Sequence, residues 1–165
     1  MTDELVRWTA WLAMAGLGAS AAARLAGMPG QSGGDSRRRL LWTAACVLLW
    51  IHVACAFQYA HHGSHAEAYA HTARQTEQVV GLDWGGGIYF NYLLMVLWAG
   101  DAAWWWLAPR SFRARPPIIG GIIRGFVAFM ALNAAVVFVS GPLRWVALGV
   151  MLILGVWAIR RRRGA

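Results

Sequence analysis

The sequence predicts an all-α membrane protein, a polytopic bundle of five transmembrane helices with one short polar helix outside the membrane. Composition is the first reason, because 59% of the residues are hydrophobic and only 13% are charged, whereas roughly a quarter are charged in soluble domains. The second reason is that five long apolar segments alternate with short polar ones, and apolar runs of about 20 residues cross a bilayer as helices. We therefore expect residues 1–165 to form a single transmembrane domain.

The first span is expected at about residues 8–24, between Arg7 and Arg24. Both arginines can extend along the helix so that their charges reach the membrane interfaces. A cleaved signal peptide is the competing interpretation, because the small residues of the GASAAA stretch suit a cleavage site. We favour an uncleaved helix, since residues 1–7 carry no net positive charge. The Gly- and Ser-rich residues 27–36 are then expected to form a loop.

Four further spans are expected at about residues 40–60, 85–107, 118–139 and 143–159. The third expected span contains Asp101 and the fourth contains Arg124. Both residues lie about 9 Å from the same membrane face at about 1.5 Å per helical residue, so the sequence predicts an ion pair between them. The tryptophans at positions 104–106 fit an aromatic belt at the membrane interface.

The arginines predict the orientation of the bundle. All fifteen basic residues are arginine, and eleven of them fall in three segments that five spans would place on one membrane face. Cytoplasmic segments are enriched in basic residues, so we expect a cytoplasmic C-terminus, with the N-terminus and residues 58–84 outside. The arginines flank apolar runs, as topology signals do, and do not form a binding stripe for nucleic acid. The expected partners are therefore the lipid bilayer and other membrane subunits, and no nucleic acid is expected as a partner.

The compartment follows from composition. The absence of lysine and the abundance of alanine, arginine and tryptophan suggest a GC-rich bacterial genome. The expected location is therefore the bacterial inner (plasma) membrane, with the outer polar segment on the periplasmic face.

That outer segment, residues 58–84, holds four of the five histidines and three of the seven acidic residues. Ser64 followed three residues later by Glu67 has the pattern of a capping box. Residues 65–80 contain neither glycine nor proline, and Gly81 follows them. They therefore predict a short helix that begins after Ser64 and ends at Gly81.

A metal centre is the candidate functional site of this segment. Neutral imidazole is the commonest metal ligand in proteins, and several imidazoles with a carboxylate suit zinc, copper or iron. The candidate ligands are His52, His61, His62, His65, His71 and Glu67. Because one helix cannot turn His65 and His71 to the same side, the set must also draw on His61 or His62 across a bend at Gly63, or on His52 from below.

Other interpretations stay open. The outer helix could instead lie at the interface with its histidines hydrogen-bonded, respond to pH, or dock a partner, which would make the protein a non-catalytic subunit or scaffold of a larger membrane complex. For His52, a plain interhelical hydrogen bond competes with a polar pocket shared with Asn91 and Asn133. A b-type haem on His52 is disfavoured, because no other span carries a histidine. No catalytic motif is present, so whether the protein is an enzyme stays open.

Overall fold

A computed structural model describes residues 2–26 and 32–137, together with positions 145, 149, 152, 153, 156 and 160. The described elements are α1 (Thr2–Ala26), α2 (Ser32–Cys55) with its π-helical extension η1 (Ala56–Ala60), α3 (His65–Val80), α4 (Gly87–Leu107), α5 (Pro109–Ala114), and α6 (Pro117–Leu132) with its π-helical extension η2 (Asn133–Val137). Across these ranges every element is helical and no strand occurs, which confirms the all-α class. The expected fifth span, residues 143–159, lies almost entirely outside the described residues.

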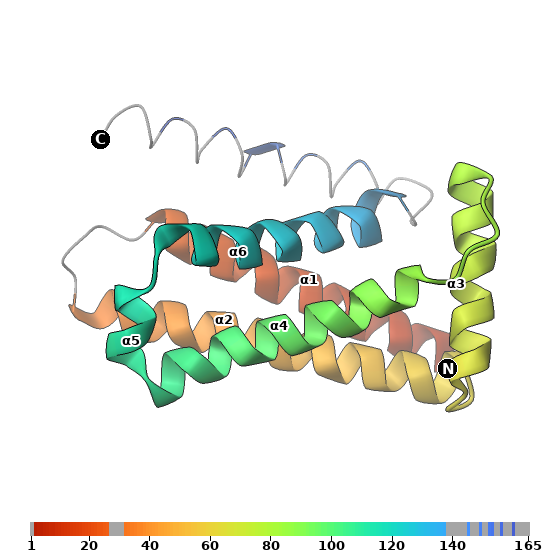
Figure 1. Ribbon diagram of the computed structural model, residues 1–165, viewed down its shortest axis with the longest axis horizontal. Coiled ribbons are helices and arrows are strands. Elements are labelled where there is room, and N and C mark those ends of the chain that lie inside the picture. The colour runs from red at the N-terminus through yellow and green to blue at the C-terminus, as the bar shows by residue number, and fades with distance from the viewer. Residues whose placement is uncertain are drawn as a thin grey trace.

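The long helices α1, α2, α4 and α6 lie lengthwise beside one another, while α3 lies crosswise at one end and α5 turns at the other (Figure 1). Helix α1 packs on α2, α2 on α4, and α4 on α6. Consecutive long helices run in opposite directions, and the N-terminus lies at the end that carries α3 (Figure 1). The outer polar helix and the connections on either side of α5 therefore occupy opposite ends of the bundle.

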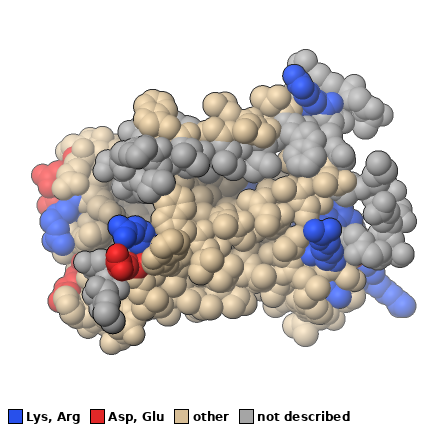
Figure 2. Space-filling model, turned by 180° about the vertical axis from the view of Figure 1, so that it is seen from behind, with Lys and Arg blue, Asp and Glu red and all other residues tan. Residues whose placement is uncertain are grey.

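Two described helical segments are long and apolar enough to cross a membrane, namely Asp35–Ala60 with 26 residues and Pro117–Ala135 with 19 residues. Charged side chains lie near the two ends of the face shown in Figure 2, with a broad uncharged region between them. This separation of charge is what a membrane environment requires, because charged side chains are costly in the hydrocarbon region.

Helix boundaries differ from the expected ones at the α1–α2 connection. Helix α2 begins at Ser32, so residues 32–36 are helical although they were expected in a loop, and residues 27–31 are not described. Asp35 in the first turn of α2 explains the early start, because a carboxylate is favourable at the positive end of the helix dipole. Its carboxylate also accepts a hydrogen bond from Arg113 at 3.0 Å, which ties the start of α2 to α5.

Buried side chains from α2, α4, α5 and α6 form one core. Trp42 of α2 packs on Trp98 of α4 with ring centroids 4.8 Å apart, and Trp105 stacks on Phe112 of α5 at 4.6 Å. Trp105 is only 7% exposed, so its expected place in an interfacial belt is wrong. The reason is that α5 folds back over the end of α4 and covers this ring. Trp106, at 43% exposed, does lie at the surface.

Candidate functional site

The outer helix has the predicted boundaries, because α3 runs from His65 to Val80. The Ser64 hydroxyl accepts a hydrogen bond from the Glu67 backbone N–H at 3.3 Å, which is one half of the predicted capping box. Gly81 adopts a left-handed conformation with φ of 74°, and its N–H donates to the Glu77 carbonyl at 2.8 Å. Both predicted ends of this helix are thus confirmed.

The chain enters α3 through an unusual backbone. The π-helical turn η1 ends at Ala60, and His62 and Gly63 then both have positive φ angles of 49° and 70°. Glycine adopts this conformation readily, but histidine does so rarely and at some cost in free energy. Two consecutive left-handed residues produce the bend that was expected at Gly63, and it turns the chain from the end of η1 into α3.

This bend brings His61 against the side of α3. The rings of His61 and His71 lie with centroids 5.2 Å apart. Beside them, the His62 Nδ1 and the Glu67 carboxylate are 2.8 Å apart, in a pair that is largely exposed to solvent. The pKa of His61 is lowered, chiefly by burial and then by the positive charge of His71. The negative charge of Glu67 acts in the opposite direction but is the smaller effect. We refer to His61, His62, Glu67 and His71 as the outer histidine cluster.

The two other candidate histidines lie away from this cluster. His65 contacts the start of α4, where its Nδ1 is 2.9 Å from the Tyr92 hydroxyl. His52 faces α1, where its Nδ1 is 3.2 Å from the Thr9 hydroxyl. Nine residues of helix separate His52 from His61, about 13 Å at a rise of about 1.5 Å per residue. The interhelical hydrogen bond is therefore the observed arrangement for His52.

The polar pocket that was the alternative for His52 is not formed by the residues proposed for it. Asn133 donates its side-chain amide to the Phe129 carbonyl of its own helix at 2.8 Å, and Asn91 is exposed. Among the described residues, no three or more histidine, cysteine, aspartate or glutamate side chains are arranged as a ready-made metal site. The rings of His61 and His71 are adjacent but tilted by 59°, and Glu67 contacts the neighbouring His62.

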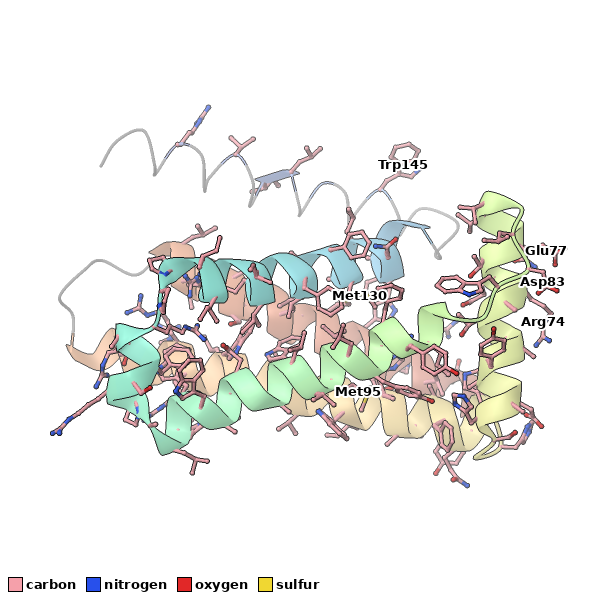
Figure 3. All side chains as sticks on the ribbon, in the orientation of Figure 1. Arg74, Glu77, Asp83, Met95, Met130 and Trp145 are labelled. Carbon is pink, nitrogen blue, oxygen red and sulfur yellow. The ribbon has the colours of Figure 1, made fainter. Side chains whose placement is uncertain are left out.

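Helix α3 lies against the turn that leads into α4, with a close backbone approach at Gly85. A Cβ atom on Gly85 would lie 2.4 Å from the Tyr69 carbonyl oxygen, so only glycine permits this contact. In Figure 3 the labelled charged side chains Arg74, Glu77 and Asp83 lie on the side that faces away from the bundle. These three charges thus point away from the bundle, while His65 at the start of α3 contacts Tyr92 of α4.

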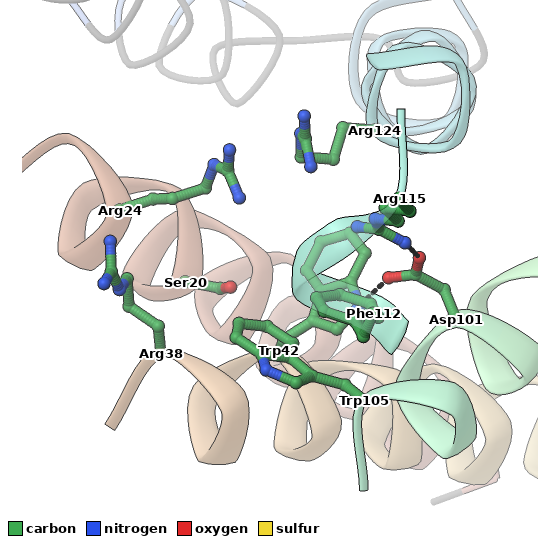
Figure 4. Close-up of a pocket in the computed structure, with 9 residues that line it drawn as sticks. All are labelled: Ser20, Arg24, Arg38, Trp42, Asp101, Trp105, Phe112, Arg115 and Arg124. Atoms are coloured by element: carbon green, nitrogen blue, oxygen red, sulfur yellow. Dashed lines mark hydrogen bonds and ion pairs between the residues drawn. The ribbon is translucent and has the colours of Figure 1, made fainter. Parts of the chain in front are cut away.

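A second polar site, which the sequence reasoning missed, lies beside α5, at the end of the bundle opposite α3 (Figure 1), and Figure 4 shows its side chains. Asp101 accepts a hydrogen bond from the Trp42 indole N–H at 2.9 Å and forms an ion pair with Arg115. The expected pairing of Asp101 with Arg124 is therefore wrong. Helix α5 reverses the chain, so that Arg115, which follows it, pairs with the Asp101 carboxylate instead. Nine residues line the inner part of this arginine pocket, namely Ser20, Arg24, Arg38, Trp42, Asp101, Trp105, Phe112, Arg115 and Arg124.

One signal in the sequence could have revealed this pocket. Arg24 and Arg38 are positioned at the ends of two expected spans, on the same expected membrane face as the charges inside the third and fourth spans. Their interpretation as topology signals alone left out the possibility that the same arginines converge. No protein-family model, curated protein sequence or solved structure matches this chain.

Proposed function

We propose that the protein is an integral protein of the bacterial inner membrane that binds a transition metal ion at its outer histidine cluster, for metal handling or metal-dependent chemistry. The bundle has five spans, a cytoplasmic C-terminus, and α3 on the periplasmic side. The observation that carries the proposal is the approach of His61 to His71 across the bend, with ring centroids 5.2 Å apart. Two imidazoles at this separation can turn their nitrogens towards one ion with nitrogen–metal distances of about 2.0–2.1 Å.

Glu67 supports the site as a third ligand. It lies one helical turn before His71, and its carboxylate contacts His62 at 2.8 Å. Rotation of this exposed side chain away from His62 would direct an oxygen to the ion, while His62 could serve as a further nitrogen ligand. Three protein ligands leave a position for water or a substrate, as in catalytic zinc sites, and an open position also allows an ion to be passed on.

Metal binding by the purified protein tests the proposal directly. We expect one equivalent of zinc or cobalt per chain, with loss of binding in His61→Ala and His71→Ala. His65→Asn is the matched control, because His65 lies on the same helix but contacts Tyr92. Absence of stoichiometric metal from the wild type, or equal loss of binding in the His65 control, would contradict the proposal.

A second candidate function, scaffolding of a larger membrane complex, is favoured by the apolar surface at the far end of α3. Val79, Val80, Leu82 and Trp84 are all exposed there. Exposed apolar residues that are grouped together mark contact with a partner protein or with the membrane surface. Photo-crosslinking from position 82 in native membranes would yield a discrete protein adduct if the scaffold function holds, and lipid adducts alone if this surface rests on the bilayer.

A further inference from the structure

We propose that the arginine pocket is a binding site for a phosphate group, carried either by a lipid or by a free phosphate. The pocket lies at the end of the bundle opposite α3 and draws its arginines from α1, α2, α6 and the segment around α5 (Figure 4). This site is independent of the outer histidine cluster, since no residue belongs to both.

Charge is the first reason. Five arginines line the pocket against two aspartates, and both aspartates already have partners. Asp101 is paired with Arg115, and Asp35 is paired with Arg113 at 3.0 Å. Within the described part of the chain, Arg24 and Arg124 donate no hydrogen bond and form no ion pair. The pocket therefore holds positive charge beyond what its own carboxylates neutralise.

The arginines also lie close enough together to repel one another. The charges of Arg38 and Arg115 act on Arg24, and those of Arg24 and Arg115 act on Arg124. Gly120 shows how closely two of them converge, because a Cβ atom there would lie 2.7 Å from Nη1 of Arg124 and 3.1 Å from Nη2 of Arg115. Like charges at such short range in a half-buried pocket raise the free energy of the folded state, and an anion between them would reverse that effect.

Shape and donor type favour phosphate over a carboxylate. The inner cavity, beside Ser20 and Trp42, has a volume of about 20 Å³, enough for roughly one water molecule. It adjoins an outer pocket of about 300 Å³, near the lower limit of roughly 300 Å³ for ligand pockets. Several guanidinium groups that converge on one space supply more donors than two carboxylate oxygens can accept, whereas a phosphate group offers three or four oxygens.

A buried donor adds to this argument. Trp105 lines both parts of the pocket, and its indole N–H is buried with no hydrogen-bond partner among the described residues. An unpaired buried donor is costly. The aromatic walls formed by Trp42, Trp105 and Phe112 also exclude water from one side of the arginines, which strengthens their attraction for an anion.

Thermal unfolding of the purified full chain in dodecyl maltoside, a detergent without phosphate, tests the proposal. One arm adds phosphatidic acid to the micelles, with phosphatidylcholine as the control lipid. The other arm replaces chloride with inorganic phosphate at constant ionic strength. A ligand that binds the folded state raises the unfolding temperature. Each arm is run on the wild type, on the double variant Arg24→Gln with Arg124→Gln, and on Gly120→Ala.

Gly121→Ala is the matched control for the glycine variant, because a Cβ atom at Gly121 meets nothing within 4 Å. We expect the wild type to gain thermal stability in at least one arm. Loss of each guanidinium should weaken the apparent affinity for the phosphate group about tenfold. Gly120→Ala should weaken this affinity by displacing the arginines, and Gly121→Ala should leave it unchanged. Without phosphate, the double variant should unfold at or above the wild-type temperature, because mutual repulsion has been removed.

The two arms identify the source of the phosphate. A response to phosphatidic acid alone assigns a lipid headgroup, and a response to inorganic phosphate assigns a free phosphate compound. No response of the wild type in either arm would overturn the proposal. An equal response of the wild type and the double arginine variant would overturn it as well.

Discussion

Asp101 of α4 and Arg115, which follows α5, form an ion pair in which the two side chains are only 3% and 9% exposed. The same carboxylate accepts the Trp42 indole N–H of α2 at 2.9 Å. One acidic side chain therefore links α2, α4 and the segment that leads into α6. Because the pair is buried and its carboxylate is doubly hydrogen-bonded, loss of either partner would leave an uncompensated charge at the end of the bundle at which the arginine pocket forms.

Removal of either member of this pair should be strongly destabilising. Asp101→Asn and Arg115→Gln each leave one buried charge without its partner, at a cost of about 3–5 kcal/mol in the free energy of unfolding. The double variant should recover part of that loss. Unfolding in mixed micelles with increasing denaturing detergent measures these changes. Arg124→Gln is the control and should cost little, so a loss as large as that of Arg115→Gln would show that the pairing is misassigned.

Close packing of α1 on α2 should depend on Gly16. A Cβ atom at Gly16 would lie 3.1 Å from a Leu48 methyl group and 3.3 Å from the Ala45 Cα atom. Gly16→Leu should therefore separate the helices and lower the free energy of unfolding by about 1–3 kcal/mol. Gly18→Leu is the matched control, because a Cβ atom there meets nothing within 4 Å. Equal unfolding midpoints of the two variants would contradict this prediction.

Attachment of the outer helix should depend on Gly85. In Gly85→Ala the new methyl group would collide with the Tyr69 carbonyl at 2.4 Å, and backbone cannot yield as a flexible side chain does. We expect α3 to detach from α4 at a cost of about 1–3 kcal/mol, seen as faster amide hydrogen exchange across residues 65–80. Gly100→Ala, in open space on α4, should leave the exchange unchanged. Unchanged exchange in Gly85→Ala would mean that α3 is held by other contacts.

The proposed orientation predicts which sites are accessible from each side of the membrane. Single cysteines introduced in a Cys46→Ser, Cys55→Ser background report the side by labelling with a membrane-impermeant maleimide in intact cells. Gln75→Cys should be labelled from outside, whereas Arg110→Cys should be labelled only after the membrane is opened. Protection of position 75 in intact cells would place the outer histidine cluster in the cytoplasm and would contradict the proposed function.

Features that depend on neighbouring residues were predictable. The helix from His65 to Val80 follows from the capping residue Ser64 and the stop at Gly81, and the long apolar runs predict the helices α1, α2, α4 and α6. Capping acts within one helical turn and hydropathy within one continuous segment, so the order of residues contains the whole signal. The start of α2 was the exception, because its first turn is also tied to Arg113 of another helix.

Partners that depend on the path of the chain could not be predicted. Equal depth in the membrane suggested Arg124 for Asp101, but the short helix α5 returns Arg115 to that carboxylate. Six histidine and glutamate side chains were candidate metal ligands. The left-handed pair His62 and Gly63 decides that His61 meets His71 while His65 turns to Tyr92. Small changes in a bend move side chains by several ångströms, so these contacts are a property of the packed bundle and not of local sequence.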